Sequence, residues 1–361
     1  MSYFSIPNVR LSALVAAVPS QQVSNENLEL LNRHEANTFV KAVGIRTRRM
    51  APPALCASDL CVAAAQCILQ LSELNAGDVG ALLFVTQTPD YLLPGNSTLV
   101  QRRLELSSSC YLLDVNQGCA GYIYGLASLA CVMSAARIQR GMLLVGDTIT
   151  RLLSPTDKST VPIFSDAGSA TLLELVADGE PMHFNLGGDG DGAKAIYVPG
   201  GGARDPFGPD SLSKGKQPND SARAPVHLAM CGLDVLHYVL KYVAPNIKEL
   251  LASANAGIDA PDYYIFHQAN RVLNESLVKK LGIAPQKVPE TLLDYGNTSC
   301  ATIPVTICRH LGSEVANGRT KLVLSGFGAG FSWGSALVTL ESVVCPDLLE
   351  VGFPVSESVV R

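Results

Sequence analysis

The sequence contains few charged residues: Asp, Glu, Lys and Arg together make up 16% of its 361 residues. The formal net charge is −5, and no block of like charges occurs along the chain. A protein that binds nucleic acid or an anionic membrane surface usually carries a basic patch or stripe. We therefore expect neither of them as a main partner.

Long apolar runs are also absent. No segment reaches the roughly 20 apolar residues that a membrane-spanning helix needs, and residues 1–10 lack the basic-then-apolar pattern of a signal peptide. Ten cysteines are present, but no two are spaced Cys-x-x-Cys, and most lie in apolar stretches. This pattern favours reduced, buried thiols over disulfides or a zinc site. We expect a cytoplasmic protein without a membrane span and without a bound metal.

Apolar residues make up 47% of the chain, which indicates a well-buried globular protein. The chain is longer than one ordinary core usually holds, so we expect two domains or two fused halves. Strand-like and helix-like runs alternate, which predicts an α/β fold. The predicted strands are 10–18, 81–86, 110–115, 141–147, 263–266, 321–325 and 335–340, and the predicted helices include 57–74, 122–139 and one that begins near Ser24.

Glycine, proline and polar residues crowd into residues 187–225, which predicts a long connecting loop, either a boundary or a surface insertion. We place an N-terminal half at 1–186 and a C-terminal half at 226–361. A turn at 296–304 resembles the turn around Cys119, which suggests an internal duplication. Beyond Glu341 the tail shows no clear pattern.

Cys119 lies in the stretch DVNQGCAGYIYGL, residues 114–126, between a predicted strand and a helix that is apolar all round. The first turn of a helix offers unpaired N–H groups and the positive end of the dipole, and both favour thiolate over thiol. Strand, tight turn, nucleophile and helix is a recurring arrangement for a reactive side chain. Cys119 is therefore a candidate nucleophile, and a small buried apolar residue is the alternative.

Two further polar residues stand at strand-to-helix turns. His267 ends a predicted strand, and Asn297 lies in the turn before a helix. Alone, His267 is more often structural, and Asn297 suits a turn or a helix cap. In a two-half α/β fold, however, ligands gather at such turns outside the strand ends. We expect Cys119, His267 and Asn297 to share one site.

The order of five segments resembles the ketoacyl-acyl-carrier-protein synthase III family of thiolase-like condensing enzymes. The segments are 114–126, FSDAGSA at 164–170, HQAN at 267–270, GNTS at 296–299 and GAGFSWGSA at 328–336. The likeness runs from about residue 8 to residue 341. It implies two similar α/β halves in a five-layered αβαβα arrangement. A Cys-His-Asn set differs from that of the elongating synthases, which pair the cysteine with two histidines.

The resemblance also implies a reaction. Cys119 would take an acyl group from a thioester, with backbone N–H groups of Cys119, Ala329 and Gly330 stabilising the oxyanion. A malonyl thioester, its carbonyl held by His267 and Asn297, would then lose carbon dioxide and attack the acyl group. His267 would have to donate as a neutral imidazole. No bound cofactor is implied; the substrates are acyl and malonyl thioesters of acyl carrier protein or coenzyme A, and the enzyme would be a homodimer with a shared sheet.

The segments that would bind the carrier depart from the family pattern. Thr38 stands where a tryptophan typically stacks on the adenine of coenzyme A, and Ala42 replaces an arginine. Arg271 is displaced by one from the typical arginine position, where Val272 stands. These changes predict an acyl donor carried by acyl carrier protein, or an unusual acyl group. The alternative is that coenzyme A binds in another way.

Five residues remain as candidate carrier or substrate contacts. Lys158, Gln268, Asn270 and Arg271 fall in the carrier-binding segments. Leu93 stands near the predicted acyl pocket, where the family often has phenylalanine, and a smaller side chain there would admit a longer or branched acyl chain.

Two other functions remain open. A non-condensing acyltransferase could pass the acyl group from Cys119 to an oxygen or nitrogen nucleophile, with His267 as general base. A silent subunit of a heterodimer would not need all three residues. The sequence leaves open the acyl chain, its carrier, the pathway (fatty acid or specialised product) and the role of residues 342–361.

Overall fold

Two mixed β-sheets form the framework of the protein, in a computed structural model that describes residues 2–213 and 223–352. The six-stranded sheet has the order β15-β2-β8-β7-β5-β6, formed by Leu349–Val351, Val9–Pro19, Ala167–Leu175, Arg140–Asp147, Ala81–Val85 and Tyr111–Val115. The five-stranded sheet has the order β1-β9-β14-β13-β12, formed by Ser2–Ile6, Met182–Gly188, Ser332–Glu341, Arg319–Gly328 and Tyr263–Phe266. All seven predicted strands are confirmed, with small shifts at their ends.

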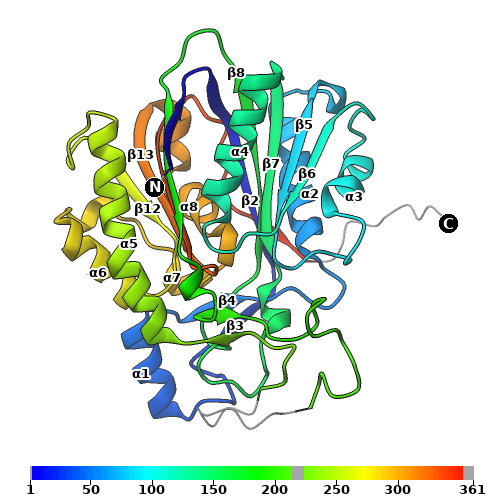
Figure 1. Ribbon diagram of the computed structural model, residues 1–361, viewed down its shortest axis with the longest axis vertical. Coiled ribbons are helices and arrows are strands. Elements are labelled where there is room, and N and C mark those ends of the chain that lie inside the picture. Colours follow the sequence, from blue (N-terminus) through cyan, green and yellow to red (C-terminus); the bar gives the residue numbers. More distant parts are fainter. Residues whose placement is uncertain (1, 214–222, 353–361) are drawn as a thin grey trace.

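Helices lie between the two sheets and on both outer faces (Figure 1). The central layer is formed by α4 (Gly121–Ala136) and α8 (Thr302–Asn317), which contact both sheets. The outer helix α2 (Ala57–Leu71) packs on the six-stranded sheet, near α3 (Asn96–Arg103). On the opposite side, α5 (Gly232–Ser253) covers the five-stranded sheet and packs on α6 (Arg271–Leu281). The predicted α/β fold is confirmed, and its layers follow the order αβαβα.

The largest hydrophobic core fills the space between the sheets. Helix α4 fits there because small residues let it approach the six-stranded sheet closely. A Cβ atom added at Gly125 would lie 2.7 Å from Leu143 Cδ1 and 2.8 Å from Val85 Cγ2. Helix α4 is apolar on all sides because it is buried between two sheets.

The helix predicted to begin near Ser24 is wrong. Residues Gln22–Ser24 form strand β3, which pairs with β4 (Thr47–Arg49), and helix α1 (Arg33–Val43) begins later at the N-cap Asn32. The polar residue that follows β3, Asn25, is fully buried and donates hydrogen bonds to two backbone carbonyl groups. The Asn25 side chain, which could have capped a helix, instead joins distant segments of the chain.

Residues 187–225 contain more structure than predicted, and residues 214–222 lie outside the described residues. The segment includes β10 (Ile196–Tyr197), which pairs with β11 (Ala229–Met230). Division of the chain into domains at this segment stays a prediction. The sheets do not follow the division, because β1 and β9 belong to the five-stranded sheet while β15 joins the six-stranded one.

Among the described residues, we find no helix with the length and apolarity needed to cross a bilayer.

Candidate active site

Cys119 lies in the turn between β6 and α4 and is 8% exposed. Strand β13 passes directly over it. A Cβ atom added at Gly328 would lie 2.7 Å from the Cβ and 2.8 Å from the Sγ of Cys119, and one added at Gly326 would lie 2.8 Å from its carbonyl oxygen. Any side chain at these two positions would displace the cysteine, so the glycines define the room for its sulfur.

Burial raises the pKa of Cys119 to about 12, and the negative charge of Asp147 adds to the rise. The backbone N–H groups of Cys119 and Ala329 and the side chain of Ser299 act in the opposite direction. The expectation that the helix start favours a thiolate is therefore wrong for this structure, because desolvation outweighs the local hydrogen bonds. Cys119 is a thiol at neutral pH, and its proton must leave when the sulfur attacks.

His267 follows β12, and its backbone N–H donates to the carbonyl of Ser325 at 2.8 Å. Its Nδ1 lies 2.8 Å from Thr302 Oγ1, and that hydroxyl donates to the carbonyl of Ser299 at 3.0 Å. The Thr302 oxygen therefore accepts a proton from Nδ1, which leaves Nε2 as an acceptor. Burial lowers the pKa of His267 to about 3, so the ring is neutral. In this tautomer Nε2 cannot be the neutral donor that we expected; it can donate only after it takes up a proton.

Asn297 is held by its backbone and by one side of its amide. Its N–H donates to the carbonyl of Ile163 at 3.0 Å, and its own carbonyl accepts from the N–H of Ser165 at 2.8 Å. The preceding Gly296 has φ +61°, and an added Cβ would lie 3.0 Å from the Ile163 oxygen. The Oδ1 atom accepts from the N–H of Ser299 at 2.9 Å. The Nδ2 amino group is therefore the part of the side chain that is left to donate to a ligand.

Cys119, His267 and Asn297 line one cavity, as the sequence predicts. The rest of its wall is mainly apolar: Ile149, Ile163, Phe164, Ile196, Leu228, Met230, Val235, Leu273 and Phe327. Among the described residues, no Asp, Glu, Lys or Arg side chain lines this cavity. It suits a ligand that is mainly apolar and carries a polar group near the three residues.

The turn between β13 and β14 completes the cavity beside the sulfur. Ala329 lines the cavity, and its backbone N–H faces the sulfur of Cys119. Its carbonyl accepts from Ser332 Oγ at 2.7 Å, and that hydroxyl accepts from Gln117 Nε2 at 2.8 Å, which fixes the turn. Gly330 is not among the lining residues. Of the two predicted oxyanion positions in this turn, the structure places only Ala329 next to Cys119.

The two candidates that follow His267 differ in position. Asn270 lines the cavity and also caps α6, because its Oδ1 accepts from the N–H of Leu273 at 2.9 Å. Gln268 is fully buried; its Nε2 donates to the carbonyl of Phe266 at 3.0 Å, and its Oε1 accepts from the N–H of Thr291 at 3.3 Å. Backbone groups engage both ends of the Gln268 side chain, and Gln268 does not line the cavity, so its contact with substrate stays a prediction.

Lys158 and Arg271 lie outside the residues that line the cavity. Lys158 Nζ forms an ion pair with Glu35 of α1, at 2.9 Å from Oε1. Arg271 Nη1 donates to the carbonyl of Lys41 at 3.3 Å, also in α1. Both cations therefore contact α1, one through a side chain and the other through a backbone carbonyl.

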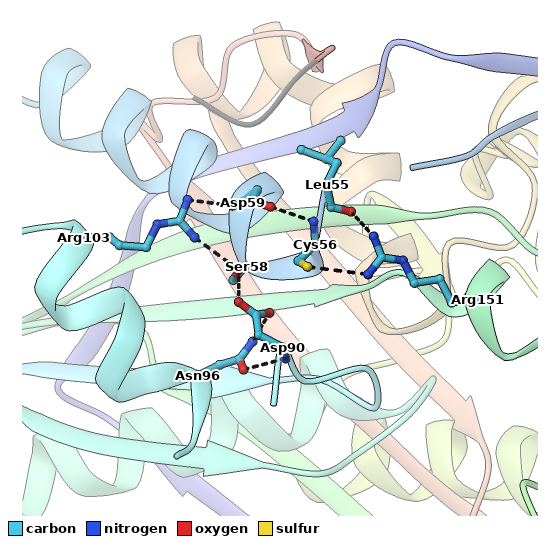
Figure 2. A network of polar contacts seen from close by, with 8 residues as sticks. All are labelled: Leu55, Cys56, Ser58, Asp59, Asp90, Asn96, Arg103 and Arg151. Carbon is cyan, nitrogen blue, oxygen red and sulfur yellow. Dashed lines mark hydrogen bonds and ion pairs between the residues drawn. The ribbon is translucent and has the colours of Figure 1, made fainter. Parts of the chain in front are cut away.

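Leu93 does not line the cavity; it is 82% exposed, between the similarly exposed Leu92 and a cis proline. Figure 2 shows the polar network that fixes this loop: Asp90 accepts from Ser58 Oγ at 2.6 Å and exchanges hydrogen bonds with Asn96. The prediction that Leu93 lies at the acyl pocket is wrong for the pocket of its own chain. From the same segment, Gln87 is the residue that reaches the cavity.

Three polar residues at the site were not among the predicted ones: Gln87 and Ser299 line the cavity, and Asp147 lies behind Ser299. Ser299 lines the cavity, and its hydroxyl donates to Asp147 Oδ2 at 2.6 Å. Asp147 is fully buried at the end of β7. Asp147 could have been found from the sequence, because it is an acidic residue at the end of an apolar strand. The backbone conformation of Ser299 could not have been found in this way.

Two family models match the chain. The model of 3-oxoacyl-[acyl-carrier-protein (ACP)] synthase III matches residues 113–190, and the model of the C-terminal part of the same family matches residues 251–340. The first range includes Cys119, and the second includes His267 and Asn297.

Curated relatives match over nearly their full length. The chain is 31% identical over 357 residues to a beta-ketoacyl-[acyl-carrier-protein] synthase III of Rhodopirellula baltica, covering 92% of this chain and 99% of that protein. It is 30% identical to a putative 3-oxoacyl-[acyl-carrier-protein] synthase 3 of Campylobacter jejuni, covering 94% and 96%. Among solved structures, a 3-oxoacyl-(acyl-carrier protein) synthase from Burkholderia xenovorans LB400 superimposes with a TM-score of 0.92 at 34% identity, covering 97% and 99% of the two chains.

Proposed function

Because this chain belongs to the 3-oxoacyl-[acyl-carrier-protein] synthase III family of acyltransferases with the thiolase-like fold, we propose that it condenses an acyl thioester with a malonyl thioester and releases carbon dioxide. The observation that carries the proposal is that Cys119, His267 and Asn297 line one uncharged cavity. We further place the enzyme in the cytoplasm, in fatty acid or related lipid synthesis.

In the first step, Cys119 Sγ attacks the carbonyl carbon of the acyl thioester while its proton passes to His267 Nε2. The thiol pKa near 12 and the imidazole pKa near 3 disfavour a preformed thiolate–imidazolium pair, so proton transfer accompanies formation of the S–C bond. The N–H groups of Cys119 and Ala329 stabilise the oxyanion. The C–S bond to the carrier then breaks, and the carrier thiol leaves with the proton.

In the second step, the malonyl thioester loses carbon dioxide, and the electrons of the broken C–C bond form an enolate. Asn297 Nδ2 donates to the enolate oxygen, whereas His267 Nε2, which has returned its proton to the leaving carrier thiol, is again an acceptor. The enolate carbon attacks the carbonyl of acyl-Cys119, the new C–C bond forms and the S–C bond breaks, and the Cys119 thiolate leaves and takes up a proton from the solvent. The product is a 3-oxoacyl thioester.

The apolar wall of the cavity favours this reaction over simple acyl transfer. A malonyl carboxylate that enters a cavity without cationic side chains is poorly solvated, and the loss of neutral carbon dioxide moves its negative charge to an enolate oxygen to which Asn297 Nδ2 can donate. Asn297 has no proton-accepting role at neutral pH and suits carbonyl binding, which the condensation needs and simple transfer does not. Acyl transfer to an oxygen or nitrogen nucleophile, with His267 Nε2 as base, is the second candidate.

One assay tests the function: the enzyme is incubated with an acyl donor and malonyl-carrier protein, and carbon dioxide release is followed. Release together with a 3-oxoacyl product is the expected result. Acylation of Cys119 without carbon dioxide release would favour simple acyl transfer instead. Absence of acylation from every donor would indicate a silent subunit.

We propose acyl carrier protein, rather than coenzyme A, as the carrier of the acyl donor. Thr38 and Ala42 are exposed on α1, and the one tryptophan of the sequence, Trp333, is 3% exposed. The Lys158 ammonium group is engaged with Glu35, which reduces the charge it offers to a phosphate.

Acyl transfer to Cys119 should therefore be faster from an acyl-carrier protein than from the coenzyme A ester of the same acyl group. Quenched-flow mass spectrometry of the acyl-enzyme gives both rates. The Lys158→Ala variant should change either rate little, because an exposed ion pair contributes only about 0–1 kcal/mol. Equal rates from the two donors would refute the preference.

We also propose a homodimer. Tyr91, Leu92 and Leu93 are 62%, 93% and 82% exposed, which is costly for three consecutive apolar side chains on a monomer. Strand β6 is an edge of the six-stranded sheet, where Tyr111 is also exposed. A second copy that covers this side would bury the apolar loop and pair the edge.

Light scattering should give a mass near twice 38.2 kDa for the purified protein. Leu92→Asp should shift the equilibrium toward the monomer, whereas Leu71→Asp, a control at a half-exposed leucine at the end of α2, should not. A monomeric wild-type protein at micromolar concentration would contradict the proposal.

A further inference from the structure

We propose that Asp147 is a positioning residue: its carboxylate holds Ser299, which in turn orients Cys119, His267 and Asn297 together. This inference deepens the proposed function, on which its activity readout rests. Asp147 itself does not line the cavity, so it acts through Ser299.

The Asp147 carboxylate is fully buried and surrounded by donors. Its Oδ1 accepts from Thr86 Oγ1 at 3.0 Å and from the N–H of Gln87 at 2.7 Å. Its Oδ2 accepts from Ser299 Oγ at 2.6 Å and from Cys300 Sγ at 3.2 Å. The first pair comes from the end of β5 and the second from the turn before α8. The carboxylate therefore joins two segments that are distant in the sequence and both border the cavity.

Ser299 contacts each of the three candidate catalytic residues with a different group. Its backbone N–H donates to Asn297 Oδ1 at 2.9 Å. Its carbonyl accepts from Thr302 Oγ1 at 3.0 Å, the hydroxyl that fixes His267 Nδ1 at 2.8 Å. Its side chain lies beside the Cys119 thiol in the cavity wall and lowers the pKa of that thiol. One residue thus sets the amide orientation of Asn297, the tautomer of His267 and the contacts of the thiol.

The backbone of Ser299 needs support to stay in this position. Its φ is +52°, in the left-handed region that a residue other than glycine adopts at a cost. Such a conformation persists when surrounding contacts determine it. The hydrogen bond from Ser299 Oγ to Asp147 is short and fully buried, and it anchors the side chain of this turn to the six-stranded sheet.

The charge of Asp147 has a separate, measurable effect on Cys119. The titratable groups around the thiol are His267 from the end of β12, Asp147 from the end of β7 and Cys300 from the turn before α8. Of these, the Asp147 charge raises the pKa of Cys119, while the Ser299 side chain lowers it. Removing Asp147 or Ser299 should therefore change the thiolate fraction in opposite directions, although both changes disturb the same site.

The test compares Asp147→Asn, Ser299→Ala and the double variant. In Asp147→Asn, the amide cannot supply both of the acceptor atoms, so Ser299 loses its partner or turns. We expect the rate constant for Cys119 acylation to fall about 10²-fold in each variant, as for a small misplacement of reacting groups, with the KM of the acyl donor unchanged. The double variant should lose no more than either single one, because the two residues act as a unit.

The second readout is alkylation of Cys119 by iodoacetamide at a fixed, mildly alkaline pH, followed by peptide mass spectrometry. Asp147→Asn should speed alkylation and Ser299→Ala should slow it. Alkylation needs no acyl donor, so it reports on this arrangement even if the proposed reaction proves wrong. A merely structural loosening would move both variants in the same direction.

Cys300→Ala is the matched control, since it removes the other donor to Asp147 Oδ2 and leaves the Ser299 contact. It should acylate at close to the wild-type rate. Acylation by Asp147→Asn at the wild-type rate, or a double variant whose loss is the product of the two single losses, would overturn the proposal. If Asp147→Asn does not fold, Ser299→Ala and Cys300→Ala still decide it: equal losses in these two variants would also overturn it.

Discussion

The Cys119→Ala variant should take up no acyl group from any thioester, and its kcat for condensation should fall by the order of 10⁶-fold, as when a covalent nucleophile is removed. No other thiol is among the residues that line the cavity in the described parts of the chain. Intact-protein mass spectrometry after incubation with the acyl donor measures the result directly.

Cys131→Ala is the control for this loss, because Cys131 lies in the same helix, α4, and is only half-buried. It should acylate like the wild-type protein. Stability should hardly distinguish the two variants, since each removes one sulfur atom. An acyl adduct on the Cys119→Ala protein would assign the nucleophile to another residue.

The Asn297→Ala variant should separate the two steps of the reaction. Its acylation should stay near the wild-type rate, because the oxyanion donors that we propose for that step are backbone N–H groups of Cys119 and Ala329. Decarboxylation of the malonyl thioester should slow by about 10²–10³-fold, the usual effect of removing one oxyanion donor. Single-turnover measurement of acyl-enzyme formation and of carbon dioxide release gives the two rates separately.

Asn297→Asp sharpens this prediction. The carboxylate keeps an oxygen that can accept from the N–H of Ser299, so the turn stays in place, but it has no amino group to donate. Carbon dioxide release should be lost in this variant as well. Equal loss of both steps in Asn297→Ala would refute the division of roles between Asn297 and the backbone donors.

The sequence predicted the α/β fold and the meeting of Cys119, His267 and Asn297 because both depend on strong local patterns. Apolar strands end at defined positions, and a polar residue at each end must lie at the same edge of the layered structure. The family resemblance then supplied the reaction. These features follow from strand order and turn chemistry, which short segments encode.

Features that depend on tertiary surroundings could not be predicted in this way. The helix start favours a Cys119 thiolate locally, but burial under β13 has the larger effect on its pKa. Gln268 lies beside His267 in the sequence, yet its side chain turns toward backbone groups of Phe266 and Thr291. Leu93 is carried outward by a loop that distant polar residues fix (Figure 2). None of these features can be predicted from the position of the residue in the sequence.

The exchange of end strands between the sheets has a consequence for synthesis on the ribosome. Strand β15 pairs with β2 at the edge of the six-stranded sheet, so that sheet is incomplete until residue 351 has emerged. Strand β1, made first, pairs with β9, which in turn pairs with β14 from the last part of the chain. Neither half can finish its sheet without strands from the other. During synthesis, the N-terminal half therefore has strand edges without their partner strands. The cavity around Cys119 is complete only when residues up to Ala329 have been made.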